Sequence, residues 1–528
     1  MNFREALSVL SKSSPYAVST EKEPDDSNVL NQIKEQLYIQ TEIEVDFKRI
    51  LDSIEPNDKK LVFLCGSSGD GKSEILTRYK KRFSDSIKFH LDATHSFEPE
   101  ATAIETLDNL FNDYLDGNAP LVVGINTGML GNYAEEGKNL YVTEAIKEFL
   151  NGVDNTKEVH FLDFEDYPKF TLELESYDSA FIKSFLMRFT SGSNNIIREV
   201  YEQELQSQSA EQLLCSNYQL LSIPEVQEAI VDLLLKARLV KDQFLTARAL
   251  LDFIFSLLAG PGYIFDNLFL DKENELSSKI TSLDPVNHRT QRSDEFILSQ
   301  HLNLKNDDFV RFKTALADLG IKRSLSPESF LRAFYLLRKA SIGNDFHINF
   351  KNDFDEYLLA DYSRVWTMHD KFYKNSEFKL EIRKFYKDVV IAALHRYMNK
   401  NAPKLEKGHY LLSDCNGVHV CCEINIQPDF AAITKNRPKN NASFNVCLKA
   451  EDQTIMLPMN INLFELLGKI IEGYRPNKHD KSTVVMLDDL VDKLVEAANS
   501  SNTLFLVTKN KRIKVTKIDE DEIEVSGV

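Results

Sequence analysis

A glycine-rich loop that ends in lysine and serine carries the clearest chemistry in this sequence. Residues 66–73 read G-S-S-G-D-G-K-S, directly after an apolar run at residues 61–64. In the Walker A motif this order lets backbone N–H groups surround a β-phosphate, while the lysine neutralises phosphate oxygens and the serine hydroxyl ligates Mg²⁺. The motif predicts a site for a nucleoside triphosphate and Mg²⁺. Its residues are Gly66, Ser67, Ser68, Gly69, Asp70, Gly71, Lys72 and Ser73.

Hydrolysis would also need an acid that holds Mg²⁺ and polarises the attacking water. Two carboxylates end predicted strands, Asp92 after residues 87–91 and Asp163 after residues 159–162. The most apolar run, residues 121–125, ends in Asn126, and in ATPases of the AAA+ kind such an asparagine senses the γ-phosphate. If Asn126 is that sensor, an upstream strand must supply the acid. We therefore predict Asp92 as the catalytic acid and Mg²⁺ ligand, with Asp163, or neither acid, as the alternatives.

Arg248 lies in a run at residues 244–251 that is apolar on most sides of a predicted helix. A charged side chain in such a helix needs a partner. One hypothesis is a second sensor arginine that reaches the nucleotide from a helical lid. The commoner arrangement is a salt bridge to one of the many acids of this chain.

The base of the nucleotide is expected to be adenine. Residues 477–480 read N-K-H-D, the letters of the guanine-reading tetrad of GTPases. That tetrad belongs at a strand end roughly a hundred residues past the phosphate loop. Here it lies far beyond that position, beside a proline, so we interpret it as a coincidence and predict ATP as the ligand.

Composition and charge limit the class of protein. The chain has 528 residues, of which 43% are hydrophobic, and six scattered cysteines, which is typical of a globular protein in a reducing cytoplasm. No apolar run is long enough to cross a membrane. With 81 acidic and 63 basic residues the net charge is −18, which excludes a free-standing nucleic-acid binder. A local basic patch or a basic partner would have to bring such a chain to DNA.

The pattern of apolar residues predicts an α/β P-loop domain, then an all-α region, then a C-terminal α+β domain. Strands and helices alternate after residue 55, a helical period dominates residues 177–397, and an Asn416-Gly417 pair predicts a hairpin in the last part. We place an N-terminal helical arm at residues 1–54, the P-loop domain at 55–175, a helical lid and middle region at 176–400 and the C-terminal domain at 401–528.

Five stretches resemble the F component of phosphorothioation-dependent DNA restriction systems (DptF, also called DndF). The likeness is specific over about the first 170 residues and extends beyond them only in length and layout. The stretches are N-F-R-E-A-L-S-V-L-S-K-S-S at residues 2–14, the 66–73 loop, F-H-L-D-A-T-H-S at 89–96, G-I-N-T-G-M-L at 124–130 and F-L-D-F-E-D-Y-P at 161–168.

This resemblance implies a cytoplasmic ATPase subunit that restricts DNA lacking the host's sulfur modification. It would act with two partner proteins as part of an antiphage defence, reach DNA mainly through the complex and have no place in a membrane. A homo-oligomer is also compatible with this resemblance. The alternative is a STAND-like signalling switch ATPase that gates a partner protein without DNA.

Overall fold

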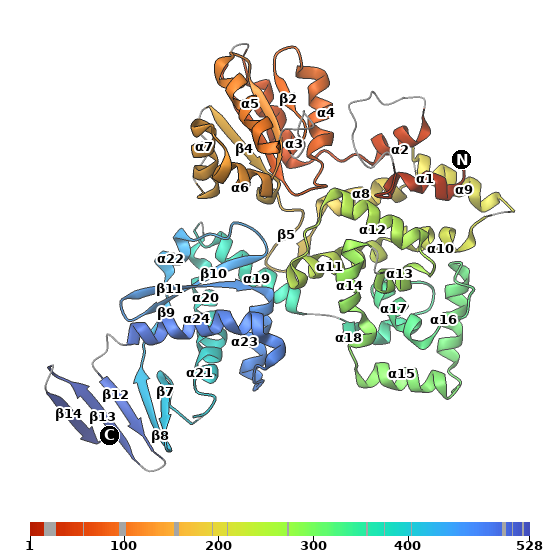
Figure 1. Ribbon diagram of the computed structural model, residues 1–528. Helices are drawn as coiled ribbons and strands as arrows, with labels where there is room; N and C mark the ends of the chain where they lie inside the picture. The colour runs from red at the N-terminus through yellow and green to blue at the C-terminus, as the bar shows by residue number, and fades with distance from the viewer. Residues whose placement is uncertain are drawn as a thin grey trace. The chain divides into compact units, whose positions relative to one another are not determined.

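The computed structural model describes residues 1–14, 28–55, 58–93, 102–152, 158–192, 194–208, 210–271, 274–354, 357–373, 375–402, 404–498, 503–508, 511–519 and 522–527. It divides into two compact units (Figure 1). Unit 1 comprises residues 1–170 and 179–355, and unit 2 comprises residues 171–178 and 356–528. The division into four segments drawn from the sequence stays a prediction.

Unit 1 contains a four-stranded parallel sheet with the strand order β2–β3–β1–β4. The buried strand β1 (Leu61–Gly66) pairs with β3 (Leu121–Asn126) on one side and with β4 (Val159–Asp163) on the other. The short strand β2 (Lys88–His90) forms an edge beside β3. The apolar run at residues 121–125 therefore lies beside β1, as predicted, because strands covered on both faces are apolar throughout.

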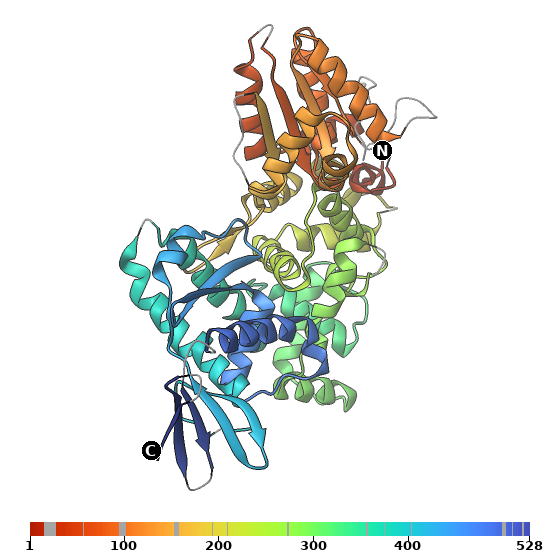
Figure 2. The same ribbon diagram turned by 60° about the vertical axis from the view of Figure 1, so that its left-hand side comes forward.

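Helices cover both faces of this sheet, so the fold has three layers (Figures 1 and 2). On one face, α3 (Glu42–Asp52) and α4 (Lys72–Phe83) pack their apolar side chains against the strands. On the other face lie α5 (Ala103–Asp116), α6 (Thr127–Glu136) and α7 (Leu140–Leu150). This arrangement holds β1 in the middle of the α/β core and the loop after it at the carboxyl edge of the sheet.

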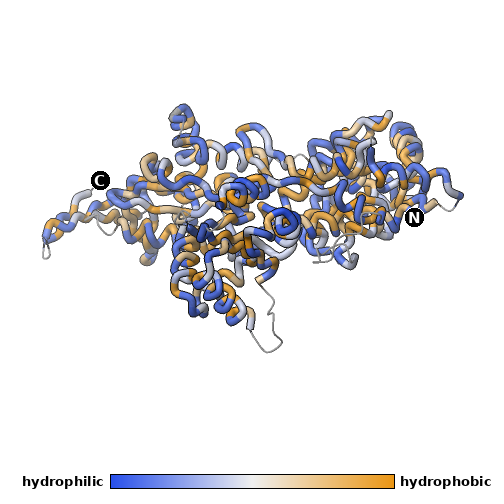
Figure 3. The backbone as a smooth tube through the Cα atoms, turned by 90° about the horizontal axis from the view of Figure 1, so that it is seen from above, coloured by the Kyte–Doolittle hydropathy of each residue, from blue (hydrophilic) through white to orange (hydrophobic). Residues whose placement is uncertain are grey.

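The rest of unit 1 is helical. Along the backbone of the chain, hydrophilic and hydrophobic residues alternate over short distances (Figure 3). Asn2 caps the first helix, as its side chain accepts a hydrogen bond from the N–H of Glu5. The remaining helices are α1 (Phe3–Leu7), α2 (Val29–Leu37), α8 (Ala180–Thr190), α9 (Ile196–Gln206), α10 (Gln212–Leu221), α11 (Pro224–Lys241), α12 (Ala247–Ala259), α13 (Ile264–Leu270), α14 (Glu275–Ile280), α15 (Gln291–His301), α16 (Asp307–Asp318), α17 (Pro327–Leu337) and α18 (Lys351–Phe354).

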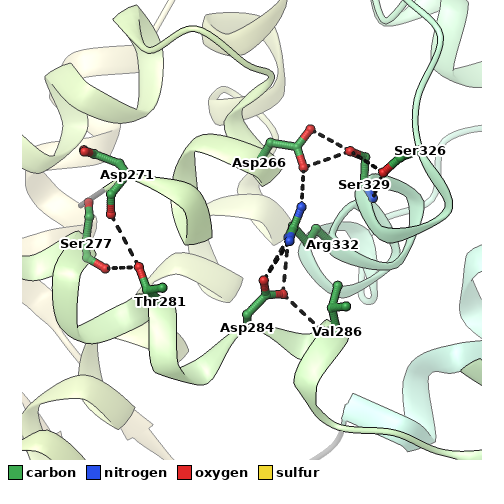
Figure 4. A network of polar contacts seen from close by, with 9 residues as sticks. All are labelled: Asp266, Asp271, Ser277, Thr281, Asp284, Val286, Ser326, Ser329 and Arg332. Carbon is green, nitrogen blue, oxygen red and sulfur yellow. Dashed lines mark hydrogen bonds and ion pairs between the residues drawn. The ribbon is translucent and has the colours of Figure 1, made fainter. Parts of the chain in front are cut away.

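A buried arginine ties three segments of this helical part together (Figure 4). Arg332 on α17 forms an ion pair of 3.0 Å with Asp266 on α13 and one of 2.8 Å with Asp284. The hydroxyl of Ser329 also donates to Asp266, at 2.9 Å. Because both carboxylates meet the same guanidinium away from water, the loss of Arg332 would leave two buried negative charges side by side.

We expect Arg332→Ala to lower the free energy of unfolding of unit 1 by ~3–5 kcal/mol, the usual cost of breaking a buried ion pair. Denaturation followed by the helical circular dichroism signal would measure it. Arg289→Ala is the matched control, since the side chain of Arg289 is 76% exposed and pairs with Asp294 at the surface. That control should cost less than ~1 kcal/mol, and equal losses in the two variants would contradict the assigned role.

Unit 2 contains two antiparallel sheets, with the strand orders β11–β10–β9 and β14–β13–β12–β8–β7, and the small pair β5–β6. Asn416 and Gly417 join β7 to β8 with φ angles of 52° and 84°, which confirms the predicted hairpin turn. The strands and helices of unit 2 are β5 (Thr171–Leu172), β6 (Tyr177–Asp178), α19 (Tyr357–Lys371), α20 (Lys379–Phe385), a π-helical turn (Tyr386–Ile391), α21 (Ala392–Met398), β7 (His409–Cys415), β8 (Val418–Glu423), β9 (Ile426–Pro428), α22 (Phe430–Lys435), β10 (Ser443–Ala450), β11 (Gln453–Asn460), α23 (Ile461–Glu472), α24 (Lys481–Ala498), β12 (Thr503–Val507), β13 (Arg512–Lys517) and β14 (Ile523–Gly527).

The order of fold classes along the chain agrees with the prediction. A parallel sheet with helices comes first, a helical region follows, and antiparallel sheets with helices end the chain. One boundary differs, because β2 ends at His90 and Asp92 lies two residues beyond it rather than at the strand's end. Among the described residues, none of the helices has the length and apolar character that a membrane span requires.

Candidate functional site

The 66–73 loop connects the buried central strand to the first turn of α4. Gly66 is the last residue of β1, and Gly71 stands at the N-cap of α4 with a φ angle of 104°. Positive φ angles of this kind favour glycine, and they let the chain turn sharply from strand to helix. The loop therefore presents its backbone, together with the N-terminal end of α4, at the carboxyl edge of the sheet, where anions bind most readily.

Lys72 is the first residue of α4 and is 8% exposed. Its Nζ donates hydrogen bonds of 3.0 Å and 2.7 Å to the carbonyl oxygens of Gly66 and Ser67. Burial lowers the pKa of Lys72, and the charges of nearby groups, Asp70 and Asp92 among them, oppose that shift. The lysine thus lies over its own loop, where its ammonium group is held by carbonyl oxygens that phosphate oxygens could replace.

Asp70, itself a residue of the loop, contacts both the loop backbone and a distant lysine. Its carboxylate accepts a hydrogen bond of 2.7 Å from the N–H of Ser67 and forms an ion pair of 3.1 Å with Lys169. The contact with Lys169 was not foreseen, since 99 residues separate the partners. Ser68 is exposed, while Ser73, in the first turn of α4, is partly buried. The hydroxyl of Ser73 is thus on the helix that begins at the loop, the position expected of a Mg²⁺ ligand.

The register of the sheet places two of the three candidate catalytic residues beside the start of this loop. Asn126 at the end of β3 pairs with Gly66, and Asp163 at the end of β4 pairs with Cys65. Asp92 follows the edge strand β2, is exposed, and contributes to the electrostatic environment of Lys72. Asn126 and Asp163 therefore flank β1, whereas Asp92 lies beyond β3.

Asp163 has a structural role of its own. Its Oδ1 accepts a hydrogen bond of 3.1 Å from the N–H of Glu165 and so caps the short 3₁₀-helix Phe164–Asp166. Burial raises the pKa of Asp163, and the negative charge of Asp70 adds to this shift. Burial likewise raises the pKa of Glu165, whereas Arg238 on α11, 3.5 Å away, opposes the rise. These two carboxylates thus contact the 3₁₀-helix and α11, respectively.

The start of α12 touches the loop directly. The backbone N–H of Arg248 donates a hydrogen bond of 3.1 Å to the carbonyl oxygen of Gly69. Gly69 has a φ angle of +88°, and a β-carbon there would lie 3.1 Å from both the Cβ of Arg248 and the Oγ1 of Thr246. Thr246 in turn caps α12. The structure thus brings the backbone of Arg248 to the loop and adds Thr246, which the sequence did not single out. The sensor role of the Arg248 side chain stays a prediction.

Comparisons with known proteins found no protein similar to this chain. No model of a protein family matches this chain, and neither a curated protein nor a solved structure matches it.

Proposed function

We propose that this protein binds ATP with Mg²⁺ in the 66–73 loop and is the ATP-hydrolysing subunit of a phosphorothioation-dependent DNA restriction complex. The observation that carries the first part is the position of Lys72, a buried lysine at the start of α4 that lies over a glycine loop at the end of a central parallel strand. That combination of helix N-terminus, loop amides and buried cation suits a triphosphate.

Each part of the site would have a distinct task. The loop N–H groups would bind the β-phosphate, Lys72 would neutralise β- and γ-oxygens, and Ser73 would ligate Mg²⁺. The bound Mg²⁺ would neutralise charge that develops on the phosphates during transfer. Asn126 is beside Gly66 in the sheet, which suits a sensor of the γ-phosphate. Arg248 would report the nucleotide state to the helical part, because its backbone already contacts Gly69.

The choice of ATP over GTP gains support from the 477–480 tetrad. Asn477 and Asp480 form a capping box around the short helix Lys478–Asp480, so their side chains are engaged in local backbone contacts. These residues belong to unit 2, whereas the loop belongs to unit 1. A guanine-reading role would need these side chains free to contact the base.

The proposed place in DNA restriction rests on the resemblance of the first 170 residues to the DptF/DndF family. Its test has two stages. The purified chain should bind Mg-ATP more tightly than Mg-GTP in a calorimetric titration. Cells that carry the chain and its co-purifying partners should take up a phosphorothioate-modified plasmid far better than the unmodified plasmid. Failure to bind ATP would refute the site, and equal uptake of both plasmids would refute the restriction role.

One observation favours the signalling switch as a second candidate. The hydrogen bond between Arg248 and Gly69 links the loop to a helical region of more than a hundred residues, as a nucleotide-dependent switch would need. The two candidates differ in their dependence on DNA. ATP hydrolysis by the co-purified complex should rise when unmodified DNA is added if the complex restricts DNA, and should stay constant if the protein is only a switch.

A further inference from the structure

One face of the five-stranded sheet of unit 2 is apolar along its last three strands. Residues that pair directly across neighbouring strands lie on the same face of a sheet. Leu504 on β12 pairs with Val515 on β13, which in turn pairs with Val525 on β14. The other pairs on this side extend the apolar set, which we call the open face. Its members are Leu504, Leu506, Ile513, Val515, Ile523 and Val525.

The two faces of these strands differ in what covers them. On the opposite face, Phe505 is 4% exposed and contacts the ring of His409 and the guanidinium of Arg512, whose Cζ is 4.7 Å from the ring centre. On the open face none of the six apolar side chains is buried, and Ile523 and Val525 are 62% and 64% exposed. Water therefore meets a continuous apolar area, and its burial against a partner would be favourable.

Strand β14 is also an open edge. Among the described residues it pairs with β13 alone, and Figure 1 shows it at the outer end of the sheet. Beside the turn, the N–H of Ile518 donates to the carbonyl oxygen of Glu522 at 2.9 Å. Backbone groups alternate in direction along an antiparallel strand, so those of Ile523, Val525 and Gly527 point away from β13. β14 contains neither a proline nor a bulge, the usual blocks to pairing at an edge.

A second copy of β14 fits this edge in an antiparallel register about a two-fold axis at Val525. Val525 then faces its own copy, and Ile523 faces Gly527. Glu524 faces Ser526, so no like charges meet across the pair. This register joins the outward N–H and C=O groups of both strands. It also keeps the apolar side chains of both copies on one side, so the two open faces become continuous.

The charges at the two ends of the hairpin suit the same pairing. Lys511 is exposed just before β13, at the end of the sheet where Gly527 lies, whereas Asp519 and Glu522 are exposed at the turn before β14. In the two-fold register the cationic end of one copy lies near the acidic turn of the other, about 10 Å away, where salt screens the attraction only in part. A parallel pairing would bring the two acidic turns together, so charge favours the antiparallel one.

We infer that β14 is an interface at which two copies of this chain associate, with their sheets joined edge to edge. The occupant follows from the strand itself, because its free edge, its apolar side and its end charges each complement a second copy of the same strand. The interface belongs to unit 2 and does not depend on the loop of unit 1. An edge of five residues makes a small contact, of the class below about 1,200 Å² that is typical of weak association.

The test is sedimentation equilibrium of the full chain at concentrations between about 1 and about 100 μM. The unmodified chain of 60.5 kDa should form a dimer with a Kd in that range. Val525→Lys should raise the Kd at least about 10-fold, because two ammonium groups would meet across the two-fold axis.

Val485→Lys is the matched control, since Val485 on α24 is 65% exposed and lies outside the sheet. It should leave the Kd of the dimer unchanged. A chain that stays monomeric up to about 100 μM would overturn the inference. So would equal losses in the two lysine variants, or a dimer that Val525→Lys leaves intact.

The register has a test of its own in Val525→Cys. The new cysteine would face its copy with the Cα atoms about 5.5 Å apart, a separation that a disulfide spans. Mild oxidation should give more covalent dimer than in Val485→Cys or in the unmodified chain, where the exposed Cys415 sets the background. No excess of covalent dimer would refute the two-fold pairing. Circular dichroism of every variant should match that of the unmodified chain, because both substituted side chains are exposed.

Discussion

Lys72→Ala is expected to abolish ATP binding while the protein stays folded. The ammonium group of Lys72 is the cation placed over the loop, where it donates to the carbonyl oxygens of Gly66 and Ser67. Its loss would remove the charge-assisted hydrogen bonds that we propose it donates to the phosphates. Two such bonds at ~1.5–3 kcal/mol each correspond to a loss of affinity of at least about 100-fold. Alanine is well tolerated at the start of a helix interior, so α4 should persist. Calorimetric titration with Mg-ATP measures the effect.

Lys81→Ala is the matched control, because Lys81 is an exposed lysine on the same helix. It should bind ATP as the unmodified chain does, with the same melting temperature. If Lys72→Ala kept the native affinity, the 66–73 loop would not be the nucleotide site. If Lys72→Ala unfolded the protein, its hydrogen bonds to Gly66 and Ser67 would be structural, and the loop would need another assignment.

The parts of the fold that the sequence predicted are those with strong local patterns. The run at residues 121–125 is apolar at every position except Gly124, and it pairs with β1 in the interior of the sheet. The Asn416-Gly417 pair forms its turn because both residues adopt positive φ angles. In each case the signal lies within a few neighbouring residues, and tertiary contacts reinforce the local preference.

Helix α6 shows where such patterns fail. It begins directly after Asn126 and contains Gly128 and Gly131, residues that weaken an isolated helix by up to ~1 kcal/mol each relative to alanine. Leu130 and Tyr133 are nevertheless fully buried in the core on the sheet, and this packing stabilises the helix. Packing against distant strands is not visible in a local window, so the pattern of residues 127–136 alone does not indicate this helix.

The site likewise combines features that a local motif predicts with features that depend on distant contacts. The motif identified the loop and Lys72, but the ion pair between Asp70 and Lys169 and the contact of Arg248 with Gly69 join residues far apart in the chain. Such pairs are set by how distant segments of the chain pack on the loop, which no spacing in the sequence encodes. The resemblance motif at residues 89–96 extends past Ala93 into residues outside those described.

The catalytic acid is expected to be Asp92 rather than Asp163. The order β2–β3–β1–β4 places Asn126 beside Gly66, which is the position that the sensor hypothesis requires. With the sensor on β3, the Mg²⁺-binding acid should follow the next strand outward, and that strand is β2, with Asp92 shortly after its end. Asp92→Asn should therefore slow hydrolysis at least about 100-fold and change ATP affinity little.

Asp163→Asn should have a much smaller effect, for a reason visible in the structure. The carboxylate of Asp163 caps the helix Phe164–Asp166, and asparagine caps a helix about as well as aspartate does. Steady-state ATPase rates and Mg-ATP titrations of the two variants decide between the acids. If Asp163→Asn abolished ATP hydrolysis while Asp92→Asn hydrolysed ATP at the native rate, Asp163 would be the catalytic acid. Two normal rates would mean that neither carboxylate is catalytic, and that the loop serves chiefly to bind ATP.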